Sequence, residues 1–78
     1  MRVIVMKSAK RDFKDLPVEV KQRVKKIIKR IRNDELNPEK LKDMGNSWKV
    51  KVGNYRIIME KIEGNFHLQG IVQRKDVY

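Results

Sequence analysis

Residues 47–59, SWKVKVGNYRIIM, predict the element around which the rest of the chain folds. The first half alternates apolar side chains with lysines, which is the period-two pattern of a half-buried strand. The apolar residues are Trp48, Val50 and Val52. Gly53 and Asn54 follow, a pair that tolerates positive φ and favours a two-residue hairpin turn. A second strand is therefore expected from Tyr55 to about Ile62.

A two-residue turn fixes which residues of this hairpin face each other. The apolar cross-strand pairs are then Val52–Tyr55, Val50–Ile57 and Trp48–Met59. On the other face, which we expect to be exposed to solvent, Lys51 lies opposite Arg56 and Lys49 lies beside Ile58. Like charges that face each other destabilise a hairpin, so this face suggests a bound anion, with phosphate as the natural candidate. The alternative is a solvated lysine face that protects a sheet edge.

The composition indicates one small basic domain spanning residues 1–78. The chain has 78 residues, of which 40% are hydrophobic and 38% charged, and a formal net charge of +10. This excess favours polyanionic partners such as nucleic acid, the ribosome or an acidic protein. With no cysteine, the chain has no disulfide framework, thiol nucleophile or cysteine zinc site. We expect a cytoplasmic protein without a signal peptide or membrane span.

The first half of the chain reads as a strand and two helices. Residues 2–6 form a short apolar run rich in β-branched side chains, which is typical of a strand. Ser8 is expected to cap a first helix, and Pro17 to interrupt it and begin a second. Apolar residues at helical spacing in the second are Val20, Val24, Ile27, Ile28 and Ile31. Lysines and arginines cover its remaining surface, for which a solvated role is favoured over nucleic-acid binding.

The second half reads as a loop followed by strands. Asn37 and Pro38 are expected to begin a turn or short helical piece, from which Leu36, Leu41 and Met44 reach the core. After a turn at residues 63–65, the last strand places Phe66, Leu68, Gly70 and Val72 on one face. The predicted fold class is α+β, with two N-terminal helices packed on an antiparallel sheet in the order β-α-α-β-β-β.

The register of that last strand bears on the site. A two-residue turn at Gly64 and Asn65 would place Arg74 beside Tyr55, on the apolar side of the sheet. To join Lys51 and Arg56, the chain would have to bend or slip by one residue after Val72.

The inventory of reactive side chains limits the possible chemistry. The one histidine, His67, receives no catalytic role, and the scattered acids predict no metal site. No phosphate-cradling glycine loop or cofactor motif is present. Lysine, arginine and tyrosine remain, and they suit RNA, which carries its own nucleophile in the 2′-hydroxyl. Clustered cations would neutralise the reacting phosphate and lower the pKa of a nearby tyrosine from its ordinary value of about 10.

Two motifs carry a family resemblance. WKVKVGNYRII at residues 48–58 and RKDVY at residues 74–78, in the predicted order of elements, resemble the RelE/ParE toxin superfamily and its RelE branch. The resemblance implies a toxin of a type II toxin–antitoxin system that cleaves mRNA in the ribosomal A site by 2′-hydroxyl attack, without a metal or cofactor. It also implies a RelB-like antitoxin as partner in a hetero-oligomer, with the ribosome and mRNA as targets and no membrane.

The same resemblance implies a role for each motif residue. Lys49 and Lys51 would support and neutralise the reacting phosphate, and Arg56 would clamp it. Arg74 would stabilise the leaving side electrostatically, and Tyr78 would act as the general base.

Two further classes of function stay open on the sequence. One is a ParE-like toxin that inhibits DNA gyrase by binding, and the other is a basic RNA- or ribosome-binding module without catalysis. Trp48 and Tyr55 could stack on bases in such a module, but hairpin parity favours a place in the core.

Overall fold

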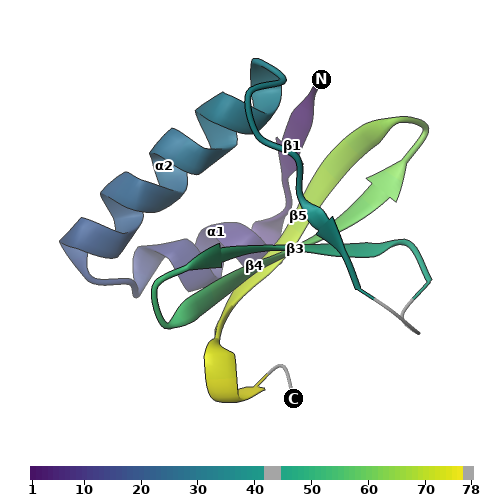
Figure 1. Ribbon diagram of the computed structural model, residues 1–78. Coiled ribbons are helices and arrows are strands. Elements are labelled where there is room, and N and C mark those ends of the chain that lie inside the picture. The colour runs from purple at the N-terminus through teal and green to yellow at the C-terminus, as the bar shows by residue number, and fades with distance from the viewer. Residues whose placement is uncertain (42–44, 77–78) are drawn as a thin grey trace.

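The computed structural model describes residues 1–41 and 45–76 (Figure 1). The elements in chain order are β1 (Val3–Val5), α1 (Lys7–Lys14), α2 (Val18–Arg32), β2 (Glu39–Lys40), β3 (Ser47–Val52), β4 (Tyr55–Ile62), β5 (Asn65–Gln73) and a 3₁₀ turn, η1 (Arg74–Asp76). Both α-helices lie on one side of the sheet. The predicted α+β architecture is therefore confirmed.

The sheet is mixed rather than antiparallel, which corrects one part of the expectation. Within the described ranges its strand order is β1-β5-β4-β3-β2. The last three strands form antiparallel hairpins, but β1 runs parallel to β5, with Val3 beside Phe66. A parallel pair needs a long connection, and two helices and three strands separate β1 from β5 in the chain.

The short strand β2 replaces the turn or helical piece expected after Asn37. Its two residues pair with β3, and the Leu41 N–H continues the pairing by donating to the Ser47 carbonyl at 2.9 Å. Glu and Lys have little intrinsic preference for strands, so the unpaired main-chain groups along β3 explain this pairing. Leu36 packs against the core as predicted, while Met44 lies outside the described residues.

The helix ends follow local rules, with one departure. Pro17 directly precedes α2 as its N-cap, but α1 begins at Lys7 with Met6 as N-cap, so Ser8 does not cap it. At the end of α2, Asp34 has a φ of 58°. The Asp34 and Glu35 amides donate back to the carbonyls of Ile31 and Arg30, a Schellman arrangement that terminates the helix.

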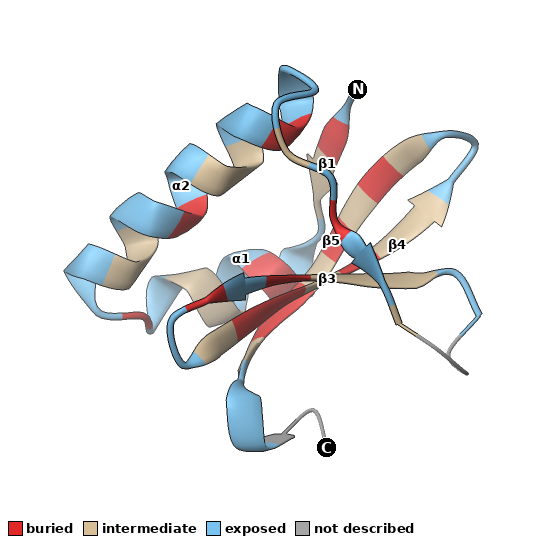
Figure 2. Cartoon of the chain, in the orientation of Figure 1, coloured by how far each residue is buried: buried red, intermediate tan, exposed pale blue. Residues whose placement is uncertain are grey.

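The core lies between the helices and the inner face of the sheet, meaning the face that the helices cover. Val24 of α2 and Ile57 of β4 are 0% exposed, and buried residues line the facing sides of both layers (Figure 2). At one end, the Trp48 and Phe66 rings meet edge to face with centroids 5.6 Å apart. Trp48 and Tyr55 both pack against this core, so their predicted place is confirmed.

Candidate functional site

The outer face of the sheet, opposite the helices, carries the predicted cations of the hairpin. The β3–β4 register is as expected, with Val50 opposite Ile57 and Lys51 opposite Arg56. Lys49 projects to the same face two residues before Lys51, about 7 Å along the strand. Lys51 is exposed and Lys49 is half-buried, beside Glu39 of β2. We call Lys49, Lys51 and Arg56 the cation trio.

Arg56 departs from the expectation of a solvent-exposed side chain, because only 5% of it is exposed. Its Nη1 donates to the carbonyls of Gly53 at 3.0 Å and Tyr55 at 2.8 Å, which turns the guanidinium back toward the hairpin turn. The buried Nε finds no hydrogen-bond partner among the described residues. Carbonyls carry no net charge, so Arg56 remains a fixed positive charge directly beside Lys51.

A β-bulge in β5 decides where Arg74 lies. The turn is at Glu63 and Gly64, one residue earlier than expected, and both have positive φ. Further along, Met59 faces Leu68 but Ile58 faces Gly70, so Gln69 is the extra residue.

The bulge supplies the one-residue slip that the sequence required, but at Gln69 rather than after Val72. Gln73 now faces Tyr55, and the Arg74 N–H donates to the Asn54 carbonyl at 2.7 Å. The slip also moves Ile71 to the inner face and Val72 to the outer face opposite Arg56, which reverses their expected parity. The Arg74 backbone is thereby held at the turn end of the β3–β4 hairpin.

Two side chains of α1 hold this bulge in place, and the sequence reading missed both. The Ser8 hydroxyl donates to the Gln69 carbonyl, and Asp12 Oδ2 accepts from the Ile71 N–H at 3.0 Å. A Cβ at Gly70 would meet Asp12 Oδ2 at 3.0 Å, so the glycine allows this close approach. The available signal was a glycine inside a strand pattern, which often marks a bulge.

Tyr78 lies outside the described residues. Within residues 1–41 and 45–76, no three His, Asp or Glu side chains gather where they could hold a metal ion. No helix in those ranges is long and apolar enough to cross a membrane.

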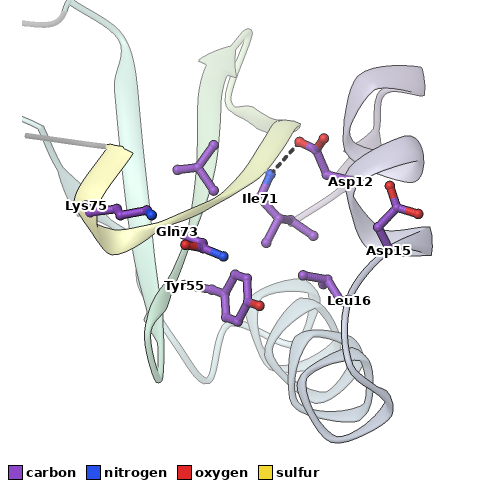
Figure 3. Close-up of a pocket in the computed structure, with 8 residues that line it drawn as sticks. Asp12, Asp15, Leu16, Tyr55, Ile71, Gln73 and Lys75 are labelled. Carbon is purple, nitrogen blue, oxygen red and sulfur yellow. Dashed lines mark hydrogen bonds between the residues drawn. The ribbon is translucent and has the colours of Figure 1, made fainter.

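Two hollows flank the chain where β5 leads into η1. The larger, about 520 Å³, lies on the helix side, and its walls include Asp12 and Asp15 of the α1 end and Tyr55 of β4 (Figure 3). The smaller, about 360 Å³, is lined by Asn54, Gln73, Arg74 and Lys75. Gln73 and Lys75 border both hollows.

Comparison with known proteins gives a consistent set of relatives. The family described as ParE toxin of type II toxin–antitoxin system, parDE, matches residues 3–77. Toxin RelE3 of Methanocaldococcus jannaschii is 30% identical, over 100% of this chain and 96% of that protein.

Solved structures agree in fold. A chain of the RelB–RelE antitoxin–toxin complex from Methanococcus jannaschii is 28% identical and superposes with a TM-score of 0.82, over 96% of this chain and 94% of that one. A mutant of E. coli toxin RelE in the free state is 16% identical, with a TM-score of 0.76 over 96% of this chain and 84% of that one. At that identity the likeness concerns the fold alone.

Proposed function

This chain belongs to the ParE toxin family within the RelE/ParE superfamily, as a RelE-like toxin of a type II toxin–antitoxin system, and we propose that it cleaves mRNA on the ribosome. The observation that carries the proposal is the pair of like charges, Lys51 and Arg56, facing each other on the outer face of the sheet. Such a pair costs stability unless an anion binds there, and the phosphodiester of RNA is such an anion.

The reaction needs little beyond charge and position. The 2′-hydroxyl attacks the adjacent phosphorus, the bond to the 5′-oxygen breaks, and a cyclic phosphate remains. The exposed Lys51 contacts the phosphate directly, and the buried Arg56 adds a fixed positive charge beneath it. Arg74 offsets the charge on the leaving 5′-oxygen until that oxygen takes a proton from water, and Tyr78, as phenolate, accepts the proton from the 2′-hydroxyl.

This assignment changes the expected role of Arg56. A guanidinium whose Nη1 already binds two carbonyls has fewer donors left for phosphate. Arg56 therefore acts mainly through its field, and Lys49 and Lys51 make the contacts that were expected of a clamp.

A second candidate is a ParE-like toxin that inhibits DNA gyrase by binding. The observation that favours it is the matching family, which is described by its ParE member. The cation trio and Arg74 favour the nuclease, because gyrase inhibition by binding requires no phosphate-cleaving cluster.

The experiment is single-turnover mRNA cleavage by the purified full chain with ribosomes, run beside a gyrase supercoiling assay. We expect A-site cleavage and no gyrase inhibition. Tyr78→Phe should slow cleavage by about a hundredfold or more while ribosome binding changes little. Lys51→Ala should weaken both cleavage and binding, whereas Lys26→Ala, which removes an exposed lysine of α2, should weaken neither.

Other results of these assays would select a different function or reject the role of Tyr78. Gyrase inhibition without cleavage selects the ParE-like function. Ribosome binding without cleavage or gyrase inhibition selects the non-catalytic module. Full cleavage by Tyr78→Phe rejects Tyr78 as the general base.

The proposal includes a RelB-like antitoxin and a cytoplasmic site of action, where ribosomes work. The net charge of +10 favours an acidic antitoxin segment, and the RelE chain from M. jannaschii was solved together with RelB. We expect an acidic partner encoded beside this gene to bind in a hetero-oligomer, more weakly as salt rises. A neighbouring gene product that does not bind at low salt would reject this partner.

A further inference from the structure

The smaller hollow beside η1 has the residue composition of a binding site rather than of a plain surface. Its four lining residues provide two side-chain amides, Asn54 and Gln73, and two cations, Arg74 and Lys75. All four are exposed. Main-chain pairing fixes the backbone of three of them, because Gln73 faces Tyr55 in the ladder and the Arg74 N–H donates to the Asn54 carbonyl at 2.7 Å.

This hollow lies at the turn end of the hairpin that carries the cation trio. Asn54 sits in the turn of the hairpin whose second cross-strand pair is Lys51–Arg56, so the two sites are about 7 Å apart along the chain. An RNA strand whose scissile phosphate lies on the trio would bring a neighbouring nucleotide to the hollow.

We propose that the hollow is a nucleotide subsite, in which Lys75 binds the phosphate of the neighbouring nucleotide, beside Arg74 at the leaving oxygen, and Asn54 and Gln73 read the edge of its base. The codon preference rests on the proposed mRNA cleavage, but nucleotide binding and its base preference do not. Side-chain amides carry a donor and an acceptor and pair best with adenine through N6 and N7. Unstacked bases of single-stranded RNA expose these edges.

The larger hollow on the helix side cannot take this ligand. Gln73 and Lys75 border it too, but Asp12 and Asp15 form its opposite wall (Figure 3). Two carboxylates repel a phosphate, so the nucleotide is directed to the side of Asn54 and Arg74.

The first test needs no ribosome. The full chain is titrated with AMP, UMP and inorganic phosphate, and main-chain amide resonances are followed by NMR. We expect AMP to shift the resonances of Asn54, Gln73, Arg74 and Lys75, and to bind roughly fivefold or more tightly than UMP. Equal shifts from phosphate alone, or no shift at millimolar AMP, would overturn the subsite.

Variants separate base reading from phosphate binding. Asn54→Ala and Gln73→Ala should abolish the preference for AMP over UMP while phosphate still binds. Among the described non-glycine residues positive φ occurs at Asp34 and Glu63, so alanine at position 54 is not strained in that way. Asn37→Ala and Gln22→Ala, which alter exposed amides elsewhere, should keep the preference. A preference that survives both subsite variants rejects base reading by these amides.

A cleavage assay then distinguishes this subsite from the proposed function itself. On ribosomes programmed with different A-site codons, the unmodified protein should cut adenine-containing codons fastest, and Asn54→Ala should flatten that profile. Cleavage with an unchanged profile in Asn54→Ala overturns the subsite alone. No cleavage by any form overturns the proposed function, and the nucleotide titration still decides the subsite.

Discussion

The inner and outer faces of the β3–β4 hairpin are built from alternate residues of one stretch of chain. On the inner face, Val52 and Ile57 are 0% exposed beneath the helices. On the outer face, Lys51 stands exposed opposite Arg56. Apolar burial on the inner face offsets the charge repulsion on the outer face, since a buried aliphatic side chain contributes about 1.5–3 kcal/mol. The hairpin can therefore hold like charges in a fixed geometry.

Arg56 is an exception to this division between a buried inner face and an exposed outer face. It belongs to the outer face by register, yet it is as buried as many core residues. Its two hydrogen bonds to main-chain carbonyls make it a structural residue as well as a charged one. Substitutions on the two faces, and at Arg56, should therefore change the stability of the fold by different amounts.

The largest effect is expected at the inner face. Ile57→Ala should lower the free energy of unfolding by about 2–5 kcal/mol, because it removes a fully buried side chain and leaves a cavity. In a domain of 78 residues this is a large share of the total stability. Urea titration followed by circular dichroism measures it. A loss no greater than that of Lys51→Ala would contradict the assigned faces.

The second-largest loss of stability is expected for Asp12, whose carboxylate holds the bulge in β5. Asp12→Ala should cost about 1–3 kcal/mol, because the buried Ile71 residue loses the carboxylate that accepts its N–H. Hydrogen exchange at Ile71 should accelerate more than exchange in the β3–β4 ladder. Asp12→Asn keeps an acceptor oxygen and should restore most of the protection. Equal protection in all three proteins would show that the bulge does not depend on this bond.

Arg56→Ala should have a smaller effect on stability, because two opposing contributions change together. It removes two hydrogen bonds but also relieves the repulsion with Lys51, so a net loss of about 1 kcal/mol is expected. The double variant Arg56→Ala, Lys51→Ala measures the coupling in a mutant cycle. Additive effects of the two substitutions would mean that the facing charges do not interact.

The parts of this fold that followed from the sequence are local ones. The register of the β3–β4 hairpin follows from alternation and a two-residue turn, both contained in residues 47–59. The parallel pairing of β1 with β5 is non-local, and no residue in β1 specifies its neighbour. The two-residue strand β2 is formed by the edge that it meets rather than by its own Glu39 and Lys40.

The candidate site also has parts that the local sequence predicts and parts that depend on residues far away in the chain. Lys51 and its opposition to Arg56 are visible in the alternation, but the burial of Arg56 depends on how its guanidinium turns toward two carbonyls. The position of Arg74 depends on a bulge braced by Ser8 and Asp12, about sixty residues away in the chain. Gly70 was the one local sign of that bulge.

The smallest effect on stability is expected at the exposed outer face. Lys51→Ala should leave the free energy of unfolding within about 0.5 kcal/mol, or raise it, because an exposed side chain is removed and a like-charge pair is relieved. The same variant should lose ribosome-dependent cleavage. A thermal melt beside the cleavage assay separates the two effects, and an unfolded Lys51→Ala protein would contradict the division between the faces.

We propose above that the outer face cleaves RNA through the RNA's own 2′-hydroxyl. The direct measurement is single-turnover cleavage, on ribosomes, of an mRNA with a single 2′-deoxy sugar at the scissile position, beside its all-ribose control. We expect the control to be cut to a product ending in a cyclic phosphate, and the deoxy mRNA to bind equally well and stay whole. Cleavage of the deoxy mRNA at that position would contradict this proposal.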